Sequence, residues 1–283
     1  MMTQIKAIVL DIDGTLYSSE KKVTPKTKDI LIKAQQQGIK VILASGRPTT
    51  GMIEVGKELQ LDVYEGYYVS FNGSKVVDAK TREELFDYPM DLEDAKHVLH
   101  HLKQFDRARA MINHGEYMYV HDVYDNYIDI NGTSMNIYQY EARGGNFKLC
   151  EVDDLETFVD FSVNKILTTG DPAYLETHYK AMSEPFKDTL SCMFTAPIYF
   201  EYTAKNIDKA AALDALFTSI GINKEEVISF GDGQNDTSII KYAGIGVAMG
   251  NAVAELKEVA DEITLSNEED GIAVALEQHL TLS

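Results

Sequence analysis

The feature that most constrains the fold is an apolar run that ends abruptly in acids, IVLDIDGTL at residues 8–16. Ile8 to Leu10 form a continuous apolar segment, which is typical of a strand buried on both faces of a parallel sheet. Asp11 and Asp13 follow at once, so we expect two carboxylates at the carboxyl end of this strand, where open α/β sheets bind their ligands. Neighbouring carboxylates repel each other unless a cation lies between them. A hard divalent cation such as Mg²⁺ therefore fits here, although an Asp-Gly pair alone is also a common turn.

Two further apolar segments alternate with helical patterns and predict more strands of the same sheet. Residues 39–45 and 67–73 are apolar and end in turn residues. Before the first of them, Thr24 is an expected N-cap, and Pro25 stands at the first helical position. A second helix is expected to run to about Leu61. Strands that alternate with helices in this way predict a parallel sheet with right-handed crossovers.

The pattern changes after residue 85. Residues 86–196 mix amphipathic helices with short, tyrosine-rich alternating segments, which predicts an inserted α+β module. From residue 197 the earlier pattern returns, and EVISFGDGQND is another apolar strand closed by acids. We therefore expect an open parallel α/β sheet of five or six strands, built from residues 1–85 and 197–283, with one large insertion.

The charge balance limits the possible partners. The chain has 45 Asp and Glu against 26 Lys and Arg, a formal net charge of −19, which argues against nucleic acid and anionic membrane surfaces as partners. No segment approaches the roughly 20 apolar residues of a membrane span, and the N-terminus lacks a signal-peptide pattern. Cys150 and Cys192 lie in apolar surroundings, which favours free thiols in a reducing cytosol. We therefore expect a cytoplasmic monomer or weak homo-oligomer that binds small molecules.

Several polar residues are expected at the carboxyl edge of the sheet, and their types suit phosphoryl transfer. Asp11 is the candidate nucleophile, because a carboxylate can attack phosphorus and form an aspartyl-phosphate. Asp13 is the candidate general acid and base for the leaving oxygen and for water. Lys209 would neutralise charge on the transferred group. The Ser45 hydroxyl and the Gly46 N–H would hold phosphoryl oxygens.

The sequence GDGQND at 231–236 supplies further oxygen ligands. Asp232 is expected to complete the metal site. Asp236 would bind the metal directly, act through water, or orient Lys209, and the sequence leaves these alternatives open. The expected metal ligands are Asp11, Asp13, Asp232 and Asp236.

Each of these segments also has a plainer interpretation. Residues 45–48, SGRP, are compatible with an ordinary turn. Lys209 is compatible with a solvated lysine on a helix. Their occurrence in this order, each beside an expected strand end, favours a shared site over these separate explanations.

In these residues the chain resembles the haloacid dehalogenase superfamily of hydrolases, specifically the Cof-like subclass IIB phosphatases. Its four motifs match DIDGT at 11–15, ASGRP at 44–48, Lys209, and GDGQND at 231–236. Two further stretches look like this subclass, FNGS at 71–74 and SNEEDG at 266–271. Two places depart from the pattern: Ala210 stands where glycine commonly follows the lysine, and Ser238-Ile239 replaces a common methionine-bearing segment after the fourth motif.

The resemblance implies a Rossmann-like core, a cap inserted between the second and third motifs, obligatory Mg²⁺ and an aspartyl-phosphate intermediate. It implies that the usual substrates are phosphorylated sugars or related small metabolites, whose leaving groups the cap recognises. The residues that it places against the phosphate are Ile12 (through its main chain), Ser45, Gly46, Lys209 and Asn235. It gives Arg47 and Asn72 roles on the substrate side.

The leading hypothesis is a Mg²⁺-dependent phosphatase of small phosphorylated metabolites, with sugar phosphates as the first candidates. One alternative is a phosphosugar mutase on the same scaffold. Another is a signalling module that stores a phosphoryl group on Asp11. Asp13 discriminates against storage, because a positioned acid and base accelerates hydrolysis of the acyl-phosphate. The sequence leaves the physiological substrate open.

Overall fold

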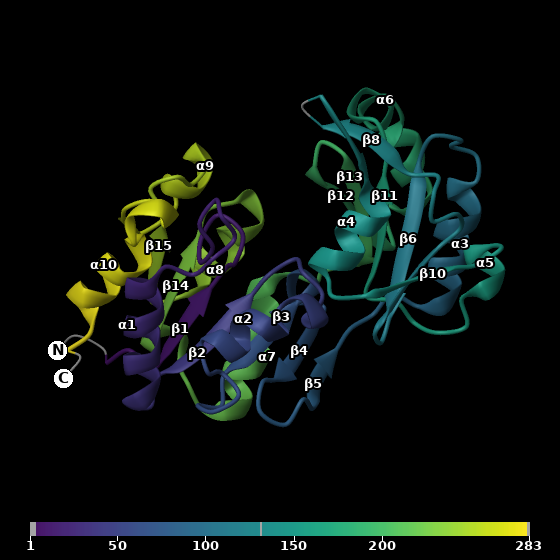
Figure 1. The fold of residues 1–283 in the computed structure, drawn as a ribbon. Helices are drawn as coiled ribbons and strands as arrows, with labels where there is room; N and C mark the ends of the chain where they lie inside the picture. The colour runs from purple at the N-terminus through teal and green to yellow at the C-terminus, as the bar shows by residue number, and fades with distance from the viewer. Residues whose placement is uncertain (1–3, 131, 282–283) are drawn as a thin grey trace. The chain divides into compact units, whose positions relative to one another are not determined.

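The structure is a computed structural model that describes residues 4–130 and 132–281. The chain divides into two compact units, one formed by Met1–Asp87 and Asp208–Ser283 and the other by Tyr88–Ile207. Figure 1 shows the helices and strands of both units along the chain. The insertion therefore leaves the first unit and returns to it once.

The first unit is built on an eight-stranded sheet in the described part of the chain. Its strands are β1 (Ala7–Leu10), β2 (Lys40–Ala44), β3 (Tyr67–Ser70), β4 (Lys75–Asp78), β5 (Glu84–Asp87), β14 (Val227–Gly231), β15 (Ile245–Ala248) and β16 (Glu262–Ile263). They lie in the order β16-β15-β14-β1-β2-β3-β4-β5. All neighbours from β16 to β3 are parallel, and β4 and β5 add an antiparallel edge. The predicted α/β sheet is confirmed, and the hairpin β4–β5 extends it beyond the expected five or six strands.

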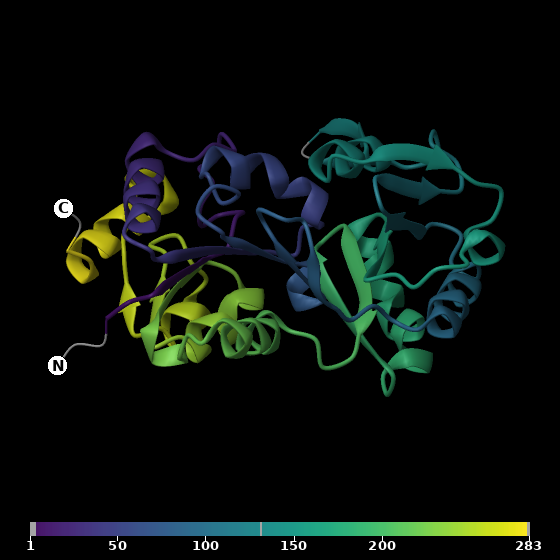
Figure 2. The same ribbon diagram turned by 90° about the horizontal axis from the view of Figure 1, so that it is seen from below.

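Helices cover both faces of this sheet, which explains why β1 is apolar at every position. Figure 2 shows α1 (Pro25–Gln36) and α2 (Ile53–Glu58) on one face and α7 (Lys209–Ile220) and α8 (Thr237–Tyr242) on the other. α10 (Gly271–His279) packs against α1, and α9 (Ala254–Lys257) precedes β16. The order of these helices follows from right-handed crossovers that run outward from β1 in both directions.

Local sequence sets the ends of the helices that matter for the site. Pro25 begins α1, as predicted. Asp208 caps α7, because its carboxylate accepts a hydrogen bond of 2.9 Å from the Ala211 N–H, and this fixes Lys209 in the first turn. α2 ends at Glu58 rather than near Leu61, because Gln60 adopts a left-handed conformation with φ 60°.

The second unit contains a six-stranded sheet in the order β10-β7-β6-β11-β13-β12 and a separate hairpin β8–β9. The sheet strands are β6 (Arg109–His114), β7 (Tyr117–Val120), β10 (Lys148–Glu151), β11 (Lys165–Thr169), β12 (Leu190–Ala196) and β13 (Tyr199–Ala204), and the hairpin joins β8 (Tyr127–Ile130) to β9 (Thr133–Asn136). Its helices are α3 (Leu92–Leu102), α4 (Ile137–Gly144), α5 (Leu155–Phe158) and α6 (Pro172–Ser183). Among the described residues, no helix combines the length and the apolarity that crossing a bilayer requires.

The structure moves both ends of the predicted insertion at 86–196. β5 ends at Asp87 and belongs to the sheet of the first unit, so the insertion begins at Tyr88. β12 and β13 form one antiparallel hairpin across residues 197–198, so the boundary at 196 cuts through paired strands. Residues 197–198 form the turn of this hairpin, and the unit continues to Ile207.

Candidate active site

The predicted site residues gather at the carboxyl edge of the sheet in the first unit. Asp11 directly follows β1, Ser45 follows β2, Asn72 lies just after β3, and Asp232 directly follows β14. Lys209 joins them from the first turn of α7. This convergence follows from the parallel strand order, because parallel strands end together at one edge.

Lys209 is a buried cation of the site, with 1% of its surface exposed. Its Nζ donates hydrogen bonds to Oδ1 of Asp11 at 2.6 Å and to Oδ1 of Asp236 at 2.7 Å. Burial acts to lower the pKa of Lys209, but the two carboxylates outweigh it and raise the pKa overall. Lys209 is therefore a fixed cation, and the solvated helix lysine that its sequence position also allowed is excluded.

Asp11 is a buried carboxylate in an acidic environment. Burial, followed by the charge of Asp236, raises the pKa of Asp11 well above its usual range, although Lys209 acts in the opposite direction. Lys209 contacts Oδ1, so Oδ2 is the oxygen that this lysine does not occupy. Desolvation and a fixed counter-ion together hold this carboxylate in one orientation.

Asp236 uses both of its carboxylate oxygens in contacts with the chain itself. Oδ1 accepts from Lys209, and Oδ2 accepts hydrogen bonds of 3.0 Å from the backbone N–H groups of Asp232 and Gly233. The side chain is fully buried. Of the alternatives that the sequence left open, this geometry favours a role in orienting Lys209 and the Asp232 turn.

Asp232 is held by Thr15 and lies tightly against Gly14. The Thr15 hydroxyl donates to Oδ1 of Asp232 at 2.8 Å. Gly14 has φ +84°, and a Cβ at this position would lie 2.3 Å from Oδ2 of Asp232, so only glycine fits. Burial raises the pKa of Asp232 to about 6, against the effect of the Thr15 hydrogen bond.

The acids can hold a metal ion. Asp11, Asp232 and Asp236 each offer a carboxylate oxygen, and these oxygens lie within 4.8 Å of one another. An all-oxygen set of ligands suits a hard divalent cation. Burial first, and then the charge of Asp236, raise the pKa of both Asp11 and Asp232, so a bound cation would favour their ionised forms. The residues therefore fit a divalent cation.

The structure does not bring Asp13, the fourth predicted metal ligand, into this cluster. Its carboxylate is half exposed and forms a bidentate pair with Arg47, with both N–O distances at 2.6 Å. The Arg47 guanidinium also lies over the Tyr17 ring, 5.3 Å from its centroid. Burial acts to lower the pKa of Arg47, but the hydrogen bonds that it donates to Asp13 and the charge of that carboxylate raise the pKa overall. Asp13 thus stands on the exposed side of the site, paired with Arg47.

The residues expected to bind phosphate lie beside one another. Ser45 is buried, and its carbonyl accepts a hydrogen bond of 3.0 Å from the Asn72 N–H. Asn72 has a left-handed backbone with φ 55°, and its side chain borders Gly46 and accepts a 3.3 Å hydrogen bond from Asn235. Ile12 is fully buried between the two N-terminal acids, so only its main chain can reach a ligand.

Sequence reasoning missed three residues that build the site. The Thr15 hydroxyl orients Asp232, although Thr15 was visible within the DIDGT motif. Gly73 has φ +102°, and a Cβ there would lie 2.2 Å from the Asp208 carbonyl, so glycine allows β3 to approach the start of α7. Asn251 donates to the Gly14 carbonyl at 2.8 Å. No spacing in the sequence indicates these contacts, because their partners are remote along the chain.

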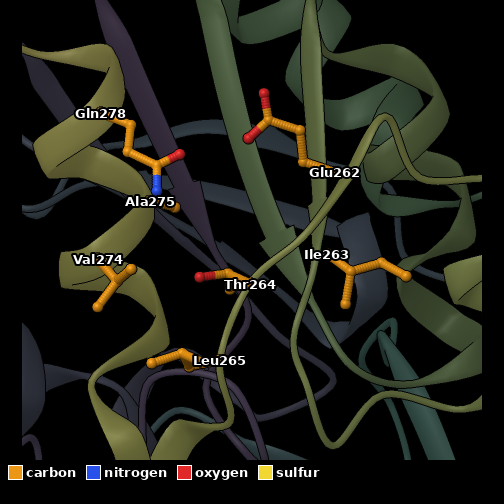
Figure 3. A pocket seen from close by; sticks show the side chains of 7 residues that line it. All are labelled: Glu262, Ile263, Thr264, Leu265, Val274, Ala275 and Gln278. Atoms are coloured by element: carbon orange, nitrogen blue, oxygen red, sulfur yellow. The ribbon is translucent and has the colours of Figure 1, made fainter.

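A pocket elsewhere in the first unit shares no residue with this site. Figure 3 shows it between the edge strand β16 and α10. Its lining comprises residues 262–265 together with Val274, Ala275 and Gln278. It lacks the convergent acids and cations of the carboxylate cluster, so the cluster is the candidate active site.

Comparisons with known proteins agree with this geometry. A family model described as haloacid dehalogenase-like hydrolase matches residues 8–276. A haloacid dehalogenase-like hydrolase from Bacteroides thetaiotaomicron has a similar crystal structure, with a TM-score of 0.89 and 33% identity, covering 98% of this chain and 100% of that one. The structure of the HAD subclass IIB sugar phosphatase BT4131 matches with a TM-score of 0.78 and 26% identity, over 96% of this chain and 98% of that one. The 5-amino-6-(5-phospho-D-ribitylamino)uracil phosphatase YcsE of Bacillus subtilis (strain 168) is 29% identical over 274 residues, 96% of this chain and 94% of that protein. These matches confirm the resemblance that the motifs indicate.

Proposed function

The chain belongs to the haloacid dehalogenase-like hydrolase family, and on this premise we propose that it is a Mg²⁺-dependent phosphatase of small phosphorylated metabolites, with sugar phosphates as the first candidates. The observation that carries the proposal is the buried Lys209, which bridges Asp11 and Asp236 beside Asp232. Two similar proteins are named for phosphorylated substrates, one as a sugar phosphatase and one as a phosphatase of a phosphoribitylamino uracil.

Asp11 is the nucleophile in this proposal. Its Oδ2 attacks phosphorus, the bond between phosphorus and the leaving oxygen breaks, and an aspartyl-phosphate forms. Lys209 holds Oδ1 at 2.6 Å, which fixes the direction of attack and places a positive charge beside the phosphoryl oxygens. A preorganised cation in a buried site stabilises developing negative charge more strongly than water does.

Asp13 is the general acid and base. In its protonated form it gives a proton to the leaving oxygen in the first step. The carboxylate that remains takes a proton from water in the second step, as water attacks phosphorus and releases phosphate from Asp11. Arg47 holds both oxygens of the Asp13 carboxylate in the structure. Arg47 therefore orients the Asp13 carboxylate before the substrate binds. As a guanidinium it can pair instead with an anionic group of the substrate, which frees an Asp13 oxygen to carry the proton.

Mg²⁺ would be held by Asp11 and Asp232, and when bound it supplies positive charge that neutralises the acids and the transferred phosphoryl group. Thr15 and Gly14 fix the Asp232 carboxylate from two sides. Asp236 orients Lys209 and the Asp232 turn through its three hydrogen bonds. Because Arg47 holds the Asp13 carboxylate, we leave Asp13 out of the proposed metal ligands.

The remaining polar groups would bind the substrate. The Ser45 hydroxyl, the Gly46 N–H and the Ile12 main chain are proposed to contact phosphoryl oxygens. Asn72 and Asn235 lie together at the border of the site, and we assign them contacts with the phosphate and the group that carries it. We assign recognition of the leaving group to the second unit, Tyr88–Ile207.

The first test is hydrolysis of p-nitrophenyl phosphate by the purified protein with and without Mg²⁺. We expect phosphate release that requires Mg²⁺ and is abolished by Asp11→Asn. Asp29→Asn, which alters an exposed carboxylate on α1, is the matched control and should keep full activity. An Asp11→Asn variant that is as active as the control would contradict the proposal.

A panel of phosphorylated metabolites, ranked by kcat/KM, then defines the substrate class. Product analysis with a hexose phosphate distinguishes a phosphatase from a mutase. Inorganic phosphate and free sugar support the proposal, whereas an isomeric sugar phosphate assigns the same residues to intramolecular transfer.

A further inference from the structure

The C-terminal SNEEDG segment at 266–271 is bound to the loop that follows the two N-terminal acids. The Asn267 side chain donates from Nδ2 to the Tyr17 carbonyl at 2.7 Å. Glu268 accepts a 2.5 Å hydrogen bond from the Ser19 N–H, and Asp270 accepts one from the Thr24 hydroxyl. About 250 residues separate these partners in the sequence, yet one short segment hydrogen-bonds to the loop at Tyr17, Ser19 and Thr24.

Asn251 connects this segment to the catalytic turn itself. Its Nδ2 donates to the Gly14 carbonyl at 2.8 Å, and its Oδ1 accepts from the Asn267 N–H at 3.1 Å. The two asparagines therefore form a continuous hydrogen-bonded chain. These hydrogen bonds hold the loop at two residues, Gly14 and Tyr17, which lie three positions apart.

Gly14 and Tyr17 both affect the position of the Asp13 side chain or of its partner Arg47. Gly14 is its direct neighbour and holds φ +84°, so the Gly14 carbonyl direction and the Asp13 side-chain direction are set by the same turn. The Tyr17 ring lies beneath Arg47, and Arg47 holds both oxygens of Asp13. Asn251 bonds to the backbone next to Asp13, and Asn267 bonds to the backbone carbonyl of Tyr17, the residue whose ring lies against Arg47.

We propose that Asn251 and Asn267 are positioning residues that hold Asp13 in the geometry required for proton transfer. The proposal rests on the proposed function, since it concerns the acid and base of that reaction. General acid catalysis needs the donor within hydrogen-bond reach of the leaving oxygen, at roughly 2.6–3.2 Å. A shift of about 1 Å in a catalytic group is enough to slow a reaction about a hundredfold.

The test compares two leaving groups. p-Nitrophenolate leaves readily without a proton, whereas a sugar alkoxide needs one. Misplacement of Asp13 should therefore slow hydrolysis of an alkyl phosphate far more than hydrolysis of p-nitrophenyl phosphate. We expect Asn251→Ala and Asn267→Ala to lower kcat/KM about tenfold or more for the best alkyl phosphate of the panel, and by less than about threefold for p-nitrophenyl phosphate.

Asn223→Ala is the matched control. Asn223 also uses its side chain in a hydrogen bond, at the N-cap of the short helix Lys224–Glu226, but it precedes β14 and so lies at the opposite edge of the sheet. Its thermal unfolding midpoint should fall as much as that of Asn267→Ala, while its ratio of the two kcat/KM values stays that of the wild type. Asn251 is exposed, so its alanine variant remains folded and keeps the test decisive.

A change in the ratio that is confined to the two asparagine variants supports the proposal. An active wild type whose ratio is unchanged in Asn251→Ala and Asn267→Ala overturns the positioning role and leaves the proposed phosphatase intact. A wild type that hydrolyses neither ester overturns both.

Discussion

Replacement of Lys209 by methionine removes the cation that the buried carboxylates of Asp11 and Asp236 share. Its Nζ lies 2.6 Å from Asp11 and 2.7 Å from Asp236. At such distances each pair attracts by about 6 kcal/mol at an effective dielectric constant of about 20, and desolvation of the three groups offsets most of this. When one partner of a buried pair is removed, the unpaired charges typically cost about 3–5 kcal/mol. We expect Lys209→Met to lower the free energy of unfolding by this amount in Mg²⁺-free buffer at pH 8.

The assay is urea denaturation followed by circular dichroism. Lys28→Met is the control, because Lys28 forms a surface pair with Glu58 at 3.3 Å in which both side chains are more than a third exposed, and its loss should cost under about 1 kcal/mol. The double variant Lys209→Met with Asp236→Asn should be more stable than Lys209→Met alone, since it carries one buried charge fewer. The loss should also shrink at pH 5, because unpaired carboxylates are neutralised as the pH falls.

Two results would refute this reasoning. A cost in Lys209→Met that equals the cost in Lys28→Met would show that Lys209 behaves as a surface lysine. A double variant that is less stable than Lys209→Met would show that Asp236 is not held by the cation. Either result would show that Lys209 does not bridge the carboxylates of Asp11 and Asp236 as the account of the site requires.

Three further predictions follow from the same geometry. The pKa of Asp232 is raised from 3.8 to about 6, so the folded protein without metal favours the neutral acid and loses stability as the pH rises from about 4 through 6. Because Mg²⁺ must displace the proton on Asp232, the affinity of the protein for Mg²⁺, measured by calorimetry, should rise about tenfold per pH unit up to about pH 6 and then level off. An affinity that does not change with pH would contradict this. Gly14→Ala places a Cβ 2.3 Å from the Asp232 carboxylate and should abolish Mg²⁺-dependent activity. Its control is Gly38→Ala, at φ +87° with no atom within 4 Å of the added Cβ, which should cost only about 1 kcal/mol of stability and keep activity. Equal activities in the two variants would refute the tight fit of Gly14 against Asp232. Thr15→Val removes the 2.8 Å hydrogen bond to Asp232 and should weaken Mg²⁺ binding about 10- to 100-fold in the same calorimetric assay, while unchanged affinity would show that Thr15 does not orient this carboxylate.

The sequence predicts the parts of the site that depend on strand ends. Asp11, Ser45 and Asp232 each follow an apolar run, and parallel strands bring such positions together. The direction in which a side chain points is not fixed by this rule. Asp13 was expected among the metal ligands, but the turn at Gly14 directs its carboxylate to Arg47.

The periodicity of apolar residues also does not predict contacts between segments that are distant in the sequence. The SNEEDG segment was visible as a motif, but its partners Gly14 and Tyr17 lie near the opposite end of the chain. The predicted boundary at 196 differs from the structure for a related reason, because the pairing of β12 with β13 across residues 197–198 has no local signal in the sequence. Long-range pairing decides both cases, and it has no local signature.

The central claim is that Asp11 carries the phosphoryl group during turnover, and chemical trapping tests it most directly. The protein is quenched with acid during steady-state hydrolysis, treated with borohydride to reduce an acyl-phosphate, digested and analysed by mass spectrometry. We predict that Asp11, and no other acid of the site, is converted to homoserine, with the greatest yield in Asp13→Asn, where hydrolysis of the intermediate is slow. Full turnover with an unmodified Asp11, or with the modification at Asp13 or Asp232, would contradict the account.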